Sequence, residues 1–263
     1  MRELAPGELL GPYLLADELG RGGMGIVYRA ERPGIGTVAL KVLRPELSAD
    51  ETYRRRFERE GRIAAELEHP HLVPVVDAGV LEGRHYLAVR YVEGGSLAQR
   101  LERESALPRE SVLRLAGELG AALDALHGRE LVHRDVKPAN VMLDEAGSAA
   151  LTDFGLAKGA AHTVLTRPGE LMGTVDYLAP ELIRGAPASP ASDVYALGCV
   201  LYECLAGRPP FAHAKGLVAT GLAILGEAPP PLRDAPAPLA RAVAAALEKD
   251  PARRPRSAGA LAV

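Results

Sequence analysis

The apolar pattern of the sequence changes once, at the glycine-containing segment Glu93–Ser96. Before it, short runs rich in β-branched and aromatic residues alternate with glycines, which predicts an antiparallel meander. After it, apolar residues recur at helical spacing, most clearly between Val112 and Leu126. The chain should therefore fold as an α+β protein, with a small β-rich part before a larger, mainly helical part. The predicted strands are Tyr13–Leu19, Gly25–Ala30, Thr37–Leu43, Leu72–Ala78 and His85–Val92.

The sequence also predicts two helices and the domain boundaries. Ser48–Glu51 has capping-box spacing, so a charged helix is expected to run from there to about Glu68, before His69-Pro70. Asp193–Leu205 is apolar nearly all round, which predicts a central buried helix. A length of 263 residues suits one two-lobed domain or two small domains. We expect an N-terminal lobe to about residue 89, a hinge at 90–95 and a C-terminal lobe from about residue 96, with a crevice between the lobes.

Charge and composition exclude several classes of function. The net charge of −3 gives no general basic field for nucleic acid or an anionic membrane. No stretch approaches the roughly 20 apolar residues of a membrane span, so no membrane contact is expected within this segment. The two cysteines, Cys199 and Cys204, lie in one apolar stretch and are expected to be buried thiols. These features predict a cytoplasmic location.

A glycine-rich segment, Gly20–Gly25, contains G-x-G-x-x-G between two predicted strands. Glycines let backbone amides approach phosphate oxygens without interference from a Cβ atom. The pattern alone also fits an ordinary hairpin or a dinucleotide-binding fingerprint. The dinucleotide version needs a helix directly after the last glycine. Here Ile26–Tyr28 continues as a strand, which argues against it.

One lysine, Lys41, lies inside the apolar strand Val38–Val42. By itself it would be read as a lysine whose charged end reaches solvent along a half-exposed strand. One hairpin after a glycine loop, however, a lysine is well suited to hold phosphates as a point charge. Such a lysine needs a carboxylate to orient it, and Glu60 is the candidate. The other glutamates of that helix, Glu58, Glu66 and Glu68, fit a solvated face.

Three further motifs follow the glycine segment and Lys41 along the chain. His133–Asn140 reads H-R-D-V-K-P-A-N, and Asp153–Gly155 and Ala179–Glu181 follow it. Together with the glycine segment and Lys41, they resemble the five conserved motifs of protein kinases. The resemblance covers the chain from Tyr13 to the last helix, and it is closest to the bacterial eukaryotic-like Ser/Thr kinases. Two further segments, Gly22–Gly25 and Ser192–Glu203, are characteristic of that group.

The resemblance implies a bilobal protein kinase fold and transfer of the γ-phosphate of ATP to serine or threonine hydroxyls of proteins. Asp135 would orient the accepting hydroxyl, and Lys137 would neutralise the transferred phosphate. Asn140 and Asp153 would bind Mg²⁺, for which Mn²⁺ can substitute. Glu60 would pair with Lys41.

The resemblance also implies the nucleotide contacts. Val27, Ala39 and Met142 would sandwich the adenine, and Tyr91 and Val92 would offer it backbone hydrogen bonds. The phosphates would lie under the glycine loop, formed by Leu19, Gly20, Arg21, Gly22, Gly23, Met24 and Gly25. Val89 would guard the back of the pocket. Arg90 departs from the glutamate common in relatives, but only main-chain groups at that position touch adenine.

Two supports and a regulatory segment are implied as well. Asp193 would brace the catalytic loop, and Glu181 would form a buried ion pair with Arg254. Arg134 and Lys158 are cations that would bind a phosphothreonine, and Thr166, preferred by its distance from Thr174, or Thr163 would carry the phosphate. The plainer reading makes both loop threonines without that role.

The implied partners are ATP, protein substrates and a second copy of the chain for trans-autophosphorylation, with no nucleic acid. Many relatives continue to a membrane helix and an external sensor, so the chain is also interpreted as the intracellular domain of a receptor kinase. A pseudokinase scaffold is the main alternative, although it would usually lack Lys41, Asp135 or Asp153. A small-molecule kinase of the aminoglycoside type is the second, although it lacks the docking segment from Gly173-Thr174 to Glu181.

Overall fold

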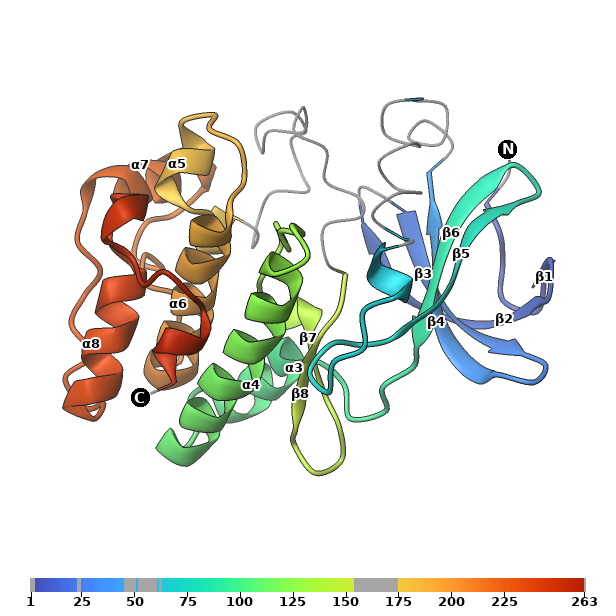
Figure 1. Ribbon diagram of the computed structural model, residues 1–263, viewed down its shortest axis with the longest axis horizontal. Helices are drawn as coiled ribbons and strands as arrows, with labels where there is room; N and C mark the ends of the chain where they lie inside the picture. The colour runs from blue at the N-terminus through green and yellow to red at the C-terminus, as the bar shows by residue number, and fades with distance from the viewer. Residues whose placement is uncertain are drawn as a thin grey trace. The chain divides into compact units, whose positions relative to one another are not determined.

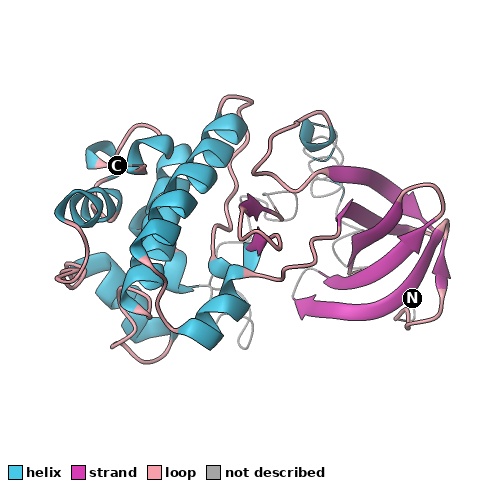
Figure 2. Ribbon diagram, turned by 90° about the horizontal axis from the view of Figure 1, so that it is seen from below, coloured by secondary structure: helices cyan, strands magenta, loops and turns pink. Residues whose placement is uncertain are grey.

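The computed structural model of the chain describes residues 3–22, 25–44, 51, 61, 63–153 and 175–262. Contacts divide the chain into two compact units. One unit comprises Met1–His69 and Val73–Val92, and the other comprises Pro70–Leu72 and Glu93–Val263. The first is built on an antiparallel sheet and the second is mainly helical (Figures 1 and 2), which confirms the predicted fold class.

The sheet of the first unit has six strands in the order β1-β2-β3-β4-β6-β5, all antiparallel to their neighbours. The order departs from a simple meander because β6 lies between β4 and β5. The strands are β1 Leu9–Leu10, β2 Tyr13–Gly22, β3 Gly25–Arg32, β4 Gly36–Leu43, β5 Val75–Leu81 and β6 Arg84–Arg90.

Several predicted boundaries in this unit differ from the structure: β2 ends at Gly22 rather than Leu19, β6 ends at Arg90 rather than Val92, and two further boundaries have a clear physical reason. The strand expected at Leu72–Ala78 begins at Val75, because Pro74 has no amide hydrogen for the ladder and Leu72 belongs to the second unit, where it bridges to Leu151. The charged helix ends at Ala65, three residues before the expected end, and the backbone tightens there into a turn. The amide of Leu67 donates to the carbonyl of Ala64, three residues back, at 3.2 Å.

Alternation along the strands places the core of this unit on one face of the sheet. Along β4, Val38, Leu40 and Val42 are buried, whereas Ala39 and Lys41 are half-buried on the opposite face. Gly25 of β3 has a strict packing role, because a Cβ atom there would lie 2.1 Å from the carbonyl oxygen of Val42. The buried cluster consists of Leu10, Tyr13, Leu15, Tyr28, Ala30, Val38, Leu40, Val42, Tyr86 and Ala88.

The second unit is organised around the helix α6 Pro190–Ala206, which packs against α4 Arg109–His127 and α8 Ala237–Ala246 (Figure 1). Both α4 and α6 contain the helices predicted from the sequence. Most residues of α6 are buried, including Ser192 and Asp193, so the prediction of a central buried helix is confirmed. The other helices are α3 Leu97–Glu104, α5 Pro180–Ile183 and α7 Leu217–Gly226. No helix in the described ranges is long and apolar enough to cross a membrane.

Short elements connect these helices and carry the loops of interest. The hairpin of β7 Val141–Leu143 and β8 Ala149–Leu151 follows η1 Pro138–Asn140, and η2 Val175–Tyr177 precedes α5. Near the C-terminus lie η3 Pro251–Arg253 and η4 Gly259–Leu261.

Candidate active site

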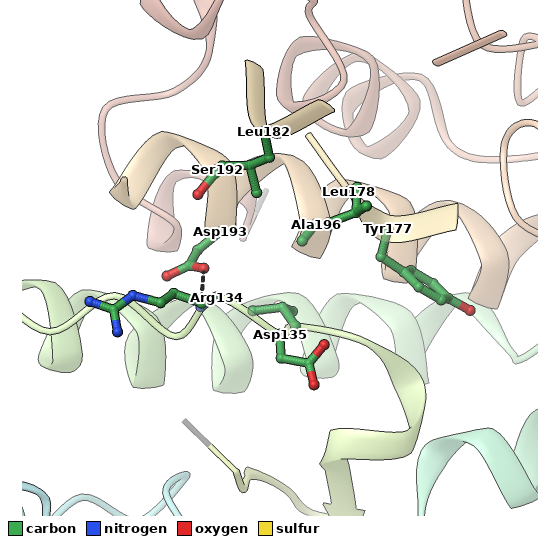
Figure 3. A pocket seen from close by; sticks show the side chains of 9 residues that line it. Arg134, Asp135, Tyr177, Leu178, Leu182, Ser192, Asp193 and Ala196 are labelled. Carbon is green, nitrogen blue, oxygen red and sulfur yellow. Dashed lines mark hydrogen bonds between the residues drawn. The ribbon is translucent and has the colours of Figure 1, made fainter. Parts of the chain in front are cut away.

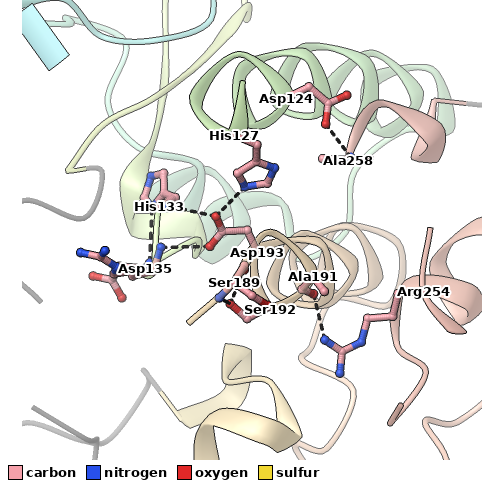
Figure 4. Close-up of polar contacts among 11 residues, drawn as sticks. Asp124, His127, His133, Asp135, Ser189, Ala191, Ser192, Asp193, Arg254 and Ala258 are labelled. Carbon is pink, nitrogen blue, oxygen red and sulfur yellow. Dashed lines mark hydrogen bonds and ion pairs between the residues drawn. The ribbon is translucent and has the colours of Figure 1, made fainter. Parts of the chain in front are cut away.

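Asp193, near the start of α6, holds the backbone of the loop His133–Asn140 (Figure 4). The Asp193 carboxylate is almost fully buried and accepts the amide of His133 at 2.8 Å and the amide of Arg134 at 2.9 Å. A buried carboxylate that accepts two backbone N–H groups fixes the positions of both. The predicted bracing of this loop by Asp193 is confirmed.

His133 links this loop to the strand before Asp153. Its ring is fully buried, and Nδ1 accepts the Asp135 amide at 3.3 Å. Nε2 therefore carries the hydrogen and donates to the carbonyl of Thr152 at 3.1 Å. Burial lowers the pKa of His133, against the opposite influence of nearby carboxylates, which favours this neutral form. The buried ring of His133 thus links the backbone of Asp135 to the backbone of Thr152.

Two residues of the site have left-handed backbone conformations, which residues other than glycine seldom adopt. Arg134 has φ of 66° and Asp153 has φ of 59°. Such conformations cost roughly 1–3 kcal/mol each and persist where surrounding contacts enforce them, commonly at functional sites. Arg134 is held in this conformation by the Asp193 carboxylate on its amide.

Three side chains predicted to be catalytic meet at Asp135. Asn140 donates from Nδ2 to the Asp135 carbonyl at 2.8 Å and to its Oδ2 atom at 3.1 Å. The Lys137 Nζ atom lies 3.1 Å from the same Oδ2 atom. Two positively polarised groups therefore orient one carboxylate, which is half-buried. This geometry suits a group that must aim or accept a hydroxyl proton.

Asn140 and Asp153 flank the same end of the β7–β8 hairpin. Val141 pairs with Leu151, and the Thr152 amide donates to the Asn140 carbonyl at 3.0 Å. Because Asn140 Nδ2 is used by Asp135, its Oδ1 atom is the one suited to a cation. One amide oxygen and one carboxylate fit Mg²⁺, which takes few protein oxygens and completes its shell with water and phosphate. Among the described residues there is no group of three or more His, Cys, Asp or Glu that could hold a metal.

The first unit gathers its predicted nucleotide contacts on one face of the sheet. Lys41 pairs directly with Val27 of β3, and Ala39 pairs with Val89 of β6. These four residues therefore share the face opposite the buried cluster. Tyr91 and Val92 follow β6 directly. Met142, expected on the other side of the adenine, lies on β7 of the second unit.

The glycine segment forms the ends of the β2–β3 hairpin, in which Gly20 pairs with Val27 and Gly22 pairs with Gly25. Arg21 extends to two carboxylates, those of Glu18 at 2.9 Å and Glu3 at 2.7 Å. Its side chain is therefore engaged away from the backbone, and the backbone is the part of Arg21 suited to phosphate. Leu19, just before this segment, has a largely exposed side chain.

The predicted Glu181–Arg254 ion pair is confirmed. The two terminal guanidinium nitrogens of Arg254, Nη1 and Nη2, each donate to the Glu181 carboxylate at 2.7 Å, and the Arg254 side chain is fully buried. Arg254 also donates to the carbonyls of Ala191 and Glu248 at 2.8 Å, and its guanidinium lies 4.9 Å from the centre of the Tyr195 ring. This network joins α5, α6 and the C-terminal segment.

A small pocket lies among the catalytic loop, η2, α5 and α6 (Figure 3). Asp135 and Arg134 line it, together with the apolar side chains of Leu178, Leu182 and Ala196. Val136 of the catalytic loop also lines this pocket and is almost fully buried, so the loop is held by packing as well as by hydrogen bonds.

Several predicted residues lie outside the described ranges. They are Gly23 and Met24 of the glycine loop, Glu60, the segment Phe154–Thr174 with its candidates Lys158, Thr163 and Thr166, and Gly173 and Thr174 of the docking segment.

Two contacts at the site were not predicted from the sequence. His127, the last residue of α4, places Nε2 2.9 Å from Asp193 Oδ2. The Tyr177 hydroxyl donates to Glu203 of α6 at 2.5 Å, and burial raises the pKa of both groups. In the sequence, each of these residues has the spacing of an ordinary helix or turn residue.

Comparison with known proteins identifies this arrangement. Residues 13–262 match the family model described as protein kinase domain. The chain is 39% identical over 262 residues to the serine/threonine-protein kinase PknD of Mycobacterium tuberculosis, covering 98% of this chain and 40% of PknD. It is 40% identical over 261 residues to the serine/threonine-protein kinase PknH of Mycobacterium bovis, covering 98% of this chain and 44% of PknH. The chain thus spans less than half the length of these relatives.

A solved structure agrees. The crystal structure of the Mycobacterium tuberculosis PknI kinase domain superposes with a TM-score of 0.76 at 36% identity, covering 99% of this chain and 97% of that one. The chain belongs to the protein kinase family, as the motifs predicted.

Proposed function

We propose that this chain is the catalytic domain of a serine/threonine protein kinase that transfers the γ-phosphate of ATP to hydroxyl groups of proteins. The observation that carries the proposal is the Asp135 carboxylate, oriented by Asn140 and Lys137 in a loop braced by Asp193. The names of the relatives support the serine/threonine class. The pseudokinase alternative has no positive support, since Lys41, Asp135 and Asp153 are all present.

Each residue would have a distinct task in this reaction. Asp135 would aim the substrate hydroxyl and accept its proton, while Lys137 would face the phosphate that is transferred. Asn140 and Asp153 would hold Mg²⁺, or Mn²⁺ as a substitute. When bound, the metal–nucleotide supplies the phosphoryl group and neutralises part of its charge.

The nucleotide itself would be held mainly from the first unit. Lys41, oriented by Glu60, would bind the phosphates together with the backbone of the glycine loop. Val27 and Ala39 would contact the adenine with Met142, and the main chain of Tyr91 and Val92 would bind its edge. Arg90 is exposed at the end of β6, in line with a main-chain role there.

The wider setting rests on the family resemblance of the motifs and on the greater length of the relatives. We propose a single kinase domain with lobes at about residues 1–89 and 96–263 joined by a hinge, located in the cytoplasm as part of a longer receptor-type protein. Protein substrates, and a second copy for trans-autophosphorylation, are the proposed partners. Arg134, beside Asp135, would bind the phosphate of Thr166 or Thr163 in the active form.

Incubation of the purified chain with radiolabelled Mg-ATP and a generic protein substrate tests the proposal. Phosphate should appear on serine and threonine of the substrate and, by mass spectrometry, within residues 156–172 of the chain itself. A chain that labels only a small molecule such as an aminoglycoside, or that labels nothing, would contradict the proposed function. An active chain without phosphate in 156–172 would contradict the regulatory part alone.

A further inference from the structure

We propose that His127 is a positioning residue for phosphate transfer, acting through Asp193 on the backbone beside Asp135. This inference rests on the proposed kinase function. His127 ends α4, whereas Asp193 lies in the first turn of α6, so the contact joins two helices to the catalytic loop (Figure 4).

The contact between His127 and Asp193 is short and largely buried. His127 Nε2 lies 2.9 Å from Asp193 Oδ2, and the two side chains are 11% and 2% exposed. The same Oδ2 atom accepts the His133 amide at 2.8 Å, and Oδ1 accepts the Arg134 amide at 2.9 Å. The other two donors are thus backbone groups of the loop, and His127 contributes a side-chain donor from a separate helix.

The third donor has a mechanical consequence. Two adjacent amides can follow the carboxylate if it rotates, because they belong to one loop. A donor anchored on α4 opposes that rotation and fixes the carboxylate plane. Arg134, whose amide the carboxylate holds, has the left-handed φ of 66°, a conformation that relaxes when its restraints weaken. Relaxation at Arg134 would displace the adjoining Asp135, and misplacement of a catalytic group by about 1 Å can cost about a hundredfold in rate.

The chain offers a matched control one turn earlier on the same helix. Asp124 accepts the amides of Ala258 and Gly259 at 2.7 and 2.9 Å and so anchors η4 (Figure 4). Like His127 it ties α4 to a distant segment, but it has no contact with Asp193 or the catalytic loop among its recorded hydrogen bonds. Its replacement should affect the C-terminal anchor without affecting catalysis.

The test compares His127→Phe, His127→Gln and Asp124→Asn in the full chain. The phenylalanine keeps the ring and removes the donor, whereas glutamine retains an N–H donor. We expect His127→Phe to lower kcat about tenfold to a hundredfold with KM for ATP changed less than about twofold. Glutamine should restore most of kcat, and Asp124→Asn should keep kcat within about twofold of the original. Hydrogen exchange of the amides of residues 133 and 134 should be faster in His127→Phe.

Three results would contradict the proposed role of His127. A kcat within about twofold of the original in His127→Phe, an equal loss in His127→Gln, or an equal loss in Asp124→Asn would overturn it. If His127→Phe does not fold, His127→Ala takes its place under the same criteria. An inactive original chain would count against the proposed function, and the amide exchange would then decide: unchanged protection of residues 133 and 134 contradicts the role of His127.

Discussion

Replacing Asp135 by asparagine is expected to lower kcat for phosphate transfer by about a thousandfold or more while the protein remains folded. Asparagine keeps the size of the side chain and one oxygen near Asn140 and Lys137, which lie 3.1 Å from the present Oδ2 atom. It loses the negative charge and the ability to accept the hydroxyl proton. Steady-state rates with Mg-ATP and a protein substrate measure the effect.

The control for this change is Asp144→Asn. Asp144 is exposed in the β7–β8 turn, where Oδ1 accepts the Ser148 amide at 2.8 Å. The same chemical change there should leave kcat within about twofold, because exposed substitutions away from the site have small effects. Asp135→Asn with near-original activity would show that another group handles the hydroxyl.

Removing the buried arginine of the second unit is expected to destabilise the protein most. Arg254→Met should lower the free energy of unfolding by about 3–5 kcal/mol, the usual cost of breaking a buried ion pair. In the original protein the Glu181 side chain is 12% exposed. The change leaves its carboxylate without a partner and removes donors from the carbonyls of Ala191 and Glu248. Urea unfolding of the original and variant proteins gives the difference.

An exposed ion pair on α3 provides the comparison. Arg100 and Glu104 are one helical turn apart with a 3.0 Å contact, and their side chains are 20% and 41% exposed. Glu104→Gln should cost less than about 1 kcal/mol, because water replaces much of the interaction. If both substitutions cost the same, burial does not determine the strength of the Glu181–Arg254 pair.

The parts of the structure that local sequence determines were predicted well. The apolar spacing from Val112 to Leu126 fixes which face of α4 is buried, and the all-round apolar run fixes α6 as a central helix. The motif resemblance also correctly indicated that Asp193 braces the loop and that Glu181 pairs with Arg254. Such motif residues have fixed partners because each partner belongs to another motif.

The features that depend on distant partners were not predicted. The two residues of β1 form a strand only because β2 offers them a partner. His127 has the pattern of an ordinary histidine at the end of an amphipathic helix, and its role depends on Asp193, 66 positions away. The start of β5 depends on the bridge that Leu72 makes with Leu151 of the second unit. The spacing of apolar residues along the sequence does not indicate these contacts.

We propose that Lys41, Asp135, Asn140 and Asp153 act on one Mg-nucleotide. Calorimetric titration of ATP into the chain, with Mg²⁺ and with a chelator, tests it most directly. We predict binding that requires Mg²⁺ and that weakens by about tenfold or more in Lys41→Met and in Asp153→Asn, since each removes a charge-assisted contact to the nucleotide or its metal. ATP binding that is absent, or that is the same with chelator and in both variants, would contradict the claim.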